Sequence, residues 1–235
     1  MSKTRLMTAA TLGVAGLMLS GCGSATPGVA VQVGDEELSV REVDAVAAHY
    51  CTARTKDLEA AVPMGYVRRY VIRFLTLRSQ ALQIADEYDV EPGTTYQNAV
   101  AQQQGTAVTM PQEVRQDYID VESALALAQD ITVQVGEVVL DREGITDATT
   151  EQVLQAGVDV FNQWPDAHGI EFDPRYGVAH GIELDPRFGV KSGDSLLTPI
   201  DTNTSVEVSE TAKSGLADQP DPAFAESLPL THRCG

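Results

Sequence analysis

Basic residues and the motifs of catalytic sites are what this sequence most lacks. Its 235 residues include 16 Lys and Arg against 34 Asp and Glu, which gives a formal net charge of −18. Such a charge repels nucleic acids and anionic lipid surfaces. The chain has no Gly-x-Ser-x-Gly, His-Glu-x-x-His or Cys-x-x-Cys motif and no glycine-rich phosphate loop. We therefore expect no enzyme activity, no cofactor, no metal and no nucleic-acid partner.

Long apolar runs are also scarce. The run Leu6–Leu19 follows Lys3 and Arg5 and ends in small residues, which is the pattern of a secretory signal. It is too short to cross ~30 Å of hydrocarbon comfortably, and no later segment has the length of a membrane span. The prediction is an exported protein whose residues 1–21 are removed.

The signal ends in Leu19-Ser-Gly-Cys22, which resembles a bacterial lipobox. The resemblance implies that Cys22 carries a diacylglycerol and that cleavage occurs before it. Two or more acyl chains anchor a protein stably, so we expect a lipid-anchored protein facing the extracytoplasmic side of the cell membrane. The alternative is ordinary cleavage nearby, with Cys22 left as a plain thiol.

Cys51 and Cys234 are the two remaining cysteines. In an oxidising compartment an even pair favours a disulfide. The alternative is two unpaired thiols, with Cys51 buried on an apolar helix face.

The hydrophobic pattern predicts a mostly helical chain with a small β element. A strand over 29–33 precedes a helix that begins near Val40, for which Ser39 and Glu42 have capping-box spacing. The other expected helices are 64–88, a weak Gln-rich one at 94–104, a long one from Pro111 to about Arg142, and one capped by Thr149 and Gln152 that ends at Pro165.

Two of the expected helices have unusual compositions. Apolar residues cover about half the circumference of 64–88, so that helix is expected to be central or to line a groove. Arg78 lies within its apolar face, either with its stem extended to solvent, paired with a carboxylate, or at a groove floor. Residues 131–135 are rich in β-branched side chains and also fit a strand, although the helical phase favours helix.

A tandem repeat follows. Residues 168–179 and 180–191 are identical at nine of twelve positions, and each copy predicts a short strand leading into an Asp-Pro turn. His168 with Glu171 suggests a metal site, but residues three apart in a strand point to opposite faces. A strand that covers the helical core is favoured. Residues 191–235 are polar and predict a low-order tail, with Cys234 able to pin its end.

The segment Val29–Asp44 resembles the opening of the SurA/PrsA-type periplasmic foldases, where a short strand "V-x-V-N-G-x-x-I-(S/T)" leads into a helix bearing "x-E-V-D". The resemblance implies a SurA N-terminal-like helical bundle over 29–190, behind a lipidated tether at 22–28. Its small β element would come from the N-terminal strand and the duplicated segment. No stretch resembles the parvulin prolyl isomerase domain of that family, so no catalytic residue is carried over.

The resulting expectation is a membrane-anchored, chaperone-like protein that binds unfolded exported polypeptides without catalysis. Tyr66, Tyr70 and Phe74 are the candidate client-contacting residues, or else ordinary core residues. The alternative function is a structural or partner-binding envelope lipoprotein with no general client binding.

Overall fold

The structure, a computed structural model, describes residues 26–178, 181–185 and 222–235. Cys22, the predicted signal and Ser192–Pro220 lie outside these residues. The helices are α1 (Val40–Arg54), α2 (Met64–Tyr88), α3 (Thr94–Ala107), α4 (Arg115–Arg142), α5 (Thr150–His168) and α7 (Pro222–Ser227). Strands β1 (Val29–Val33), β2 (Glu36–Ser39) and β4 (Ile170–Phe172) form one antiparallel sheet, and β3 (Val62–Pro63) pairs with β5 (Arg233–Cys234). The described chain is therefore mostly helical with a small antiparallel β element, as the sequence predicts.

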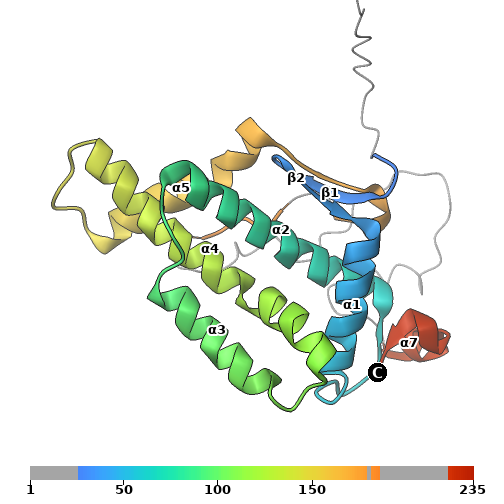
Figure 1. The fold of residues 1–235 in the computed structure, drawn as a ribbon. Helices are drawn as coiled ribbons and strands as arrows, with labels where there is room; N and C mark the ends of the chain where they lie inside the picture. Colours follow the sequence, from blue (N-terminus) through green and yellow to red (C-terminus); the bar gives the residue numbers. More distant parts are fainter. Residues whose placement is uncertain (1–25, 179–180, 186–221) are drawn as a thin grey trace, which may run out of the picture.

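Helix α2 lies at the centre of the fold (Figure 1). Between residues 63 and 85 only Gly65 is exposed. The helix contacts α1 and β1, α4, α5 and the C-terminal β5. Its side chains also hold backbone outside the helix: Gln83 Nε2 donates to the Val33 carbonyl at 2.8 Å, and Gln83 Oε1 accepts from the Asp35 amide at 3.2 Å. The central position expected from the wide apolar face is confirmed.

The ambiguous segment 131–135 is helical, as part of α4. Ile131 and Val135 are fully buried, so packing outweighs their modest strand preference. Residues Gln112–Arg142 are long and apolar enough to cross a membrane by length and composition. However, 56% of the qualifying window is buried inside the fold, as in the core helix of many proteins.

Both predicted helix starts have their caps. Ser39 Oγ accepts from the Glu42 amide at 3.1 Å, and Thr149 and Gln152 form a reciprocal capping box. The strand β2, which runs directly into Ser39, was not predicted because its exposed residues show no alternating pattern.

The prediction that Pro165 ends its helix is wrong, because α5 continues to His168. Proline has no N–H to donate to the carbonyl four residues earlier, that of Phe161. The buried Gln80 side chain of α2 supplies the missing donor, with its Nε2 2.8 Å from the Phe161 oxygen. A contact between distant helices thus compensates for a local helix breaker.

Helices α4 and α5 approach closely at two glycines. A Cβ on Gly157 would lie 1.8 Å from the Thr132 carbonyl oxygen, and one on Gly136 would lie 2.0 Å from the Val153 oxygen. Both obstacles are backbone atoms, which cannot move aside as a flexible side chain does. The pairing of these helices therefore requires glycine at both positions.

The two repeat copies are used differently. In the first copy, β4 pairs with β1, and Asp173 then caps the turn Pro174–Tyr176. In the second copy only 181–185 are described, where the Asn162 amide bonds both the N–H and the C=O of Leu184 at 2.9 Å. The strand and turn predicted for the first copy are confirmed.

The predicted low-order tail needs correction at its end. Residues 222–235 contain α7, a 3-10 turn and β5, which pairs Val62 with Cys234 and Pro63 with Arg233. Cys234 is disulfide-bonded to Cys51 of α1, 183 residues earlier in the chain, with their Cα atoms 5.5 Å apart. This end of the chain is polar in composition, but it buries Ala225 and Cys234, and the disulfide restricts the unfolded chain.

Replacing Gly157 with alanine should destabilise the protein by about 1–3 kcal/mol, the usual cost of overpacking a close contact. Gly105→Ala is the matched control, because Gly105 is also helical but has no atom within 4 Å of an added Cβ. It should be neutral or stabilising by up to about 1 kcal/mol. Urea unfolding measures both, and equal stabilities would contradict the close contact.

Gln80→Leu should leave the Phe161 carbonyl without a donor and cost about 1–3 kcal/mol. Pro165→Ala restores a backbone N–H at the position that normally bonds this oxygen. The double variant Gln80→Leu/Pro165→Ala should therefore recover part of the loss in a double-mutant cycle of unfolding free energies. Strictly additive effects would show that Gln80 does not substitute for the missing N–H.

Candidate functional site

A pocket of about 300 Å³, here called the tyrosine pocket, lies between the end of α1 and the beginning of α2. Tyrosine rings form much of its wall, and aliphatic side chains, one carboxylate and one guanidinium complete it. The lining residues are Tyr50, Cys51 and Arg54 of α1, Leu58, Val62 of β3, Tyr66, Val67 and Tyr70 of α2, Glu122 of α4, and Cys234 of β5. Helices α1, α2 and α4 and strand β3 therefore meet the C-terminal β5 at this pocket.

The tyrosines form a stacked cluster. The Tyr50 ring stacks on Tyr70 with centroids 5.3 Å apart and on Tyr118 at 6.2 Å. Tyr70 in turn lies 4.6 Å from Phe74. Offset and tilted aromatic pairs of this kind add stability beyond their buried area. The Tyr50 and Tyr70 walls of the pocket are therefore held in their orientations by ring stacking.

Glu122 fixes the polar end of this cluster. Its carboxylate accepts a hydrogen bond from the Tyr50 hydroxyl. Burial, followed by the charge of Glu122, raises the pKa of Tyr70 to about 12. Burial also raises the pKa of Tyr50, with further contributions from Tyr70 and Glu122. Both hydroxyls therefore remain protonated at neutral pH, and the rings face the pocket uncharged.

The structure separates the three predicted client-contacting residues. Tyr66 and Tyr70 line the pocket, whereas Phe74 is only 7% exposed and packs in the core behind Tyr70. Sequence reasoning missed Tyr50 and Glu122. Tyr50 shares a helix face with core residues, and Glu122 lies on a helix with no other sign of a site, so only tertiary structure brings them together.

The disulfide borders the tyrosine pocket. Cys51 and Cys234 both line it, and a wider hollow of about 640 Å³ adjoins it at Leu58. That hollow is lined by Thr55, Leu58, Glu59, Ala60, Ala61, Glu226, Arg233 and Gly235. The C-terminal residues thus form one side of both cavities.

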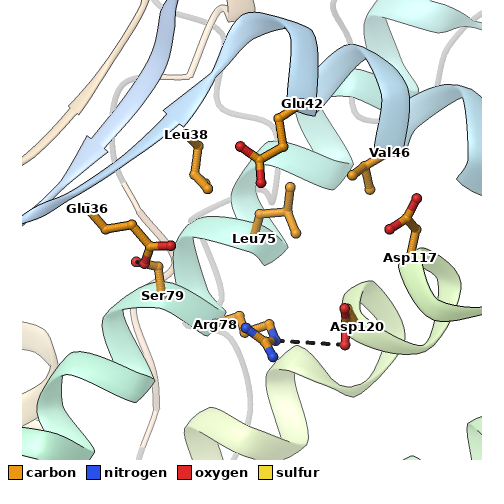
Figure 2. A pocket seen from close by; sticks show the side chains of 9 residues that line it. All are labelled: Glu36, Leu38, Glu42, Val46, Leu75, Arg78, Ser79, Asp117 and Asp120. Atoms are coloured by element: carbon orange, nitrogen blue, oxygen red, sulfur yellow. Dashed lines mark hydrogen bonds and ion pairs between the residues drawn. The ribbon is translucent and has the colours of Figure 1, made fainter.

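A second, acidic pocket of about 140 Å³ lies on another face of α2 (Figure 2). Four carboxylates from β2, α1 and α4 surround Leu75, Arg78 and Ser79: Glu36, Glu42, Asp117 and Asp120. Arg78 forms an ion pair here, although its buried Nε has no hydrogen-bond partner among the described residues, and Ser79 forms a hydrogen bond. Arg78 Nε is 3.9 Å from Asp120 Oδ1, and the Ser79 hydroxyl donates to Glu36 at 2.5 Å.

Arg78 is therefore paired with a carboxylate, one of the roles expected for it, and it also lines this pocket. Asp117 of α4 also contacts His49 of α1, with 2.5 Å between Asp117 Oδ2 and His49 Nδ1. These pairs connect α1, α2 and α4. Partly exposed ion pairs of this kind contribute about 0–1 kcal/mol each, so the acidic pocket is mainly a set of interhelical contacts.

The histidines of the repeat do not assemble a metal site in the part of the chain that the structure describes. His168 stacks on Trp164 at 4.3 Å and its Nε2 lies 3.5 Å from Glu87. His180 lies outside the described residues. Among those described, no group of three or more His, Cys, Asp and Glu side chains is arranged to hold a metal ion.

Comparison with known proteins adds no family. No protein-family model matches the chain, and no curated protein or solved structure shows significant similarity to it.

The raised pKa values predict how stability changes in alkali. Unfolded tyrosines lose their protons near pH 10, whereas Tyr70 in the fold does so at about 12. Above pH 10 the unfolded state therefore binds fewer protons, and the free energy of unfolding falls by about 1.4 kcal/mol per pH unit for each such tyrosine.

The test is urea unfolding between pH 8 and pH 12 on the native protein and on Tyr70→Phe and Tyr50→Phe. Each variant should lose stability less steeply above pH 10. Identical slopes in the native protein and both variants would contradict the burial of these hydroxyls.

Proposed function

We propose that the protein is a membrane-anchored, non-catalytic, chaperone-like binder of unfolded exported polypeptides. The tyrosine pocket accepts an apolar or aromatic side chain of the client. The observation that carries the proposal is this pocket, whose walls include three uncharged tyrosine rings, in an otherwise acidic protein.

The chemistry of the walls suits clients of varied sequence. Tyrosine presents a large apolar surface at a low cost in conformational entropy, because only two side-chain torsions are fixed. A volume of about 300 Å³ is at the lower limit for small-molecule pockets and suits one or two side chains. The site therefore recognises exposed apolar side chains rather than a folded domain.

Two features outside the pocket support the same function. The excess of acidic residues keeps a protein soluble while it holds an aggregating client. The resemblance of Val29–Asp44 to the SurA/PrsA-type foldases suggests a helical module with this role. The anchor at Cys22 would keep the protein on the extracytoplasmic side of the membrane, where exported chains emerge.

The test is light scattering of a denatured, cysteine-free client diluted into residues 23–235, a chain that keeps every residue the structure describes. We expect dose-dependent suppression of aggregation near an equimolar ratio. Tyr66→Ala should raise the required dose several-fold, because it removes a half-buried wall of the pocket.

Tyr96→Ala is the matched control. Tyr96 is also a half-buried helical tyrosine packed against the core, but it does not line the tyrosine pocket. It should suppress aggregation as the native chain does. Absence of suppression by a native chain that is folded by circular dichroism would reject general client binding, and capture of one stoichiometric folded protein would favour the partner-binding alternative.

A further inference from the structure

The residues 222–235, here called the C-terminal strap, form one side of the tyrosine pocket. Cys234 belongs to the pocket wall, and Arg233 and Gly235 line the adjoining hollow. Gly235 lies close to the loop before β3, since a Cβ placed on it would be 3.1 Å from Ala61 Cα. The strap thus lies beside the end of α1 and the beginning of α2 and narrows the space between them.

The disulfide is the covalent attachment of the strap at this place. Its backbone pairing with the body involves two residues on each strand, Val62 with Cys234 and Pro63 with Arg233. Arg233 donates from Nη1 to the Glu226 carbonyl at 2.8 Å, a bond within the strap itself. The strap also buries Ala225 and Cys234, but a two-residue strand pair is marginal in water, so the covalent Cys51–Cys234 bond is its strongest single attachment.

We infer that the C-terminal strap is a redox-controlled cover of the tyrosine pocket, which reduction of Cys51–Cys234 releases. The release itself follows from the attachment just described. Its effect on clients rests on the proposed function, because it assigns a regulation to the same site.

The reaction is a thiol–disulfide exchange with a dithiol reductant. A thiolate of the reductant attacks one sulfur, a mixed disulfide forms and the other cysteine leaves as thiolate. The second thiol of the reductant then resolves the mixed disulfide. The protein gains two electrons and two protons as two thiols, and the dithiol becomes a disulfide.

The geometry favours attack at Cys51. Cys234 is 1% exposed, whereas Cys51 is half-buried on α1. Attack on the Cys51 sulfur leaves Cys234 as the departing thiolate, on the strap. The first step therefore already breaks the covalent attachment of the C-terminal strap to α1.

Release uncovers apolar surface that the strap now contacts. Strand β5 and the 3-10 turn before it contact α2, and α7 contacts β3. Val62 of β3 and Val67 of α2 both line the pocket. The pocket and the adjoining hollow at Leu58 would then form one wider groove for a client segment.

The first measurement is hydrogen exchange by mass spectrometry on residues 23–235, with and without a phosphine reductant. We expect faster exchange confined to 222–235 and to about 58–67, with α4 and α5 unchanged. The double variant Cys51→Ser/Cys234→Ser should show this exchange pattern without reductant and should not respond to it.

The second measurement repeats the scattering assay in both redox states with the cysteine-free client. The reduced protein should suppress aggregation at a dose at least threefold lower. Unchanged exchange in 222–235 would overturn the inference, and so would exchange that rises throughout the fold, since the bond would then brace the whole protein.

The two proposals fail in distinguishable ways. Local release with equal suppression in both states would reject the regulation and leave client binding intact. Local release with no suppression in either state would reject client binding and leave the redox-controlled cover.

Discussion

The burial of α2 on nearly every side is the constraint from which the rest of the architecture follows. A helix with one exposed residue between positions 63 and 85 cannot be covered by a single neighbour. The sheet and α1 cover part of it, α4 covers another, and the C-terminal strap covers its beginning (Figure 1). The elements that do this come from both ends of the chain, so α2 determines where the N- and C-terminal segments meet.

Burial of a helix also requires partners for its polar residues, and two glutamines of α2 find theirs in the backbone of neighbouring elements. Gln83 holds the β1–β2 turn, and Gln80 bonds the Phe161 carbonyl that Pro165 leaves without a donor. A buried carbonyl without a partner costs about 1–3 kcal/mol, so these contacts determine register as well as stability. The sheet and α5 are thereby fixed relative to the same helix.

The sequence was sufficient for the positions of α1 to α5, because their apolar periodicity and caps are local, but not for α7 or for the end of α5. The course of α5 beyond Pro165 was not predictable, because the side chain that compensates for the missing N–H is Gln80, 81 positions before the Phe161 carbonyl that it bonds. The contact at Gly157 has the same character: a glycine within a helix says nothing by itself about which backbone approaches it. For 222–235 the polar composition wrongly indicated low order, whereas the expected disulfide between Cys51 and Cys234, which could pin this end, is present.

The candidate site was predictable only in part for a related reason. The wide apolar face of α2 indicated Tyr66 and Tyr70, but a half-circumference of apolar residues does not separate pocket wall from core, which is why Phe74 belongs to the latter. Tyr50 and Glu122 lie on other helices, and no local pattern connects them. The pocket is assembled from α1, β3, α2, α4 and the C-terminal β5. The sequence shows the residues of each element but not which of them come together.

The chemistry of the three cysteines is consistent with this arrangement. Cys51 precedes Cys234 by 183 residues, so the bond closes only after α2 and β3, which lie between them in the chain, are available to position its ends. Until then any third thiol competes for Cys51. In the membrane-anchored protein that we propose, acylation of Cys22 removes that competitor. The modification proposed as the anchor would therefore also direct the pairing of Cys51 with Cys234, which places the C-terminal strap beside the tyrosine pocket.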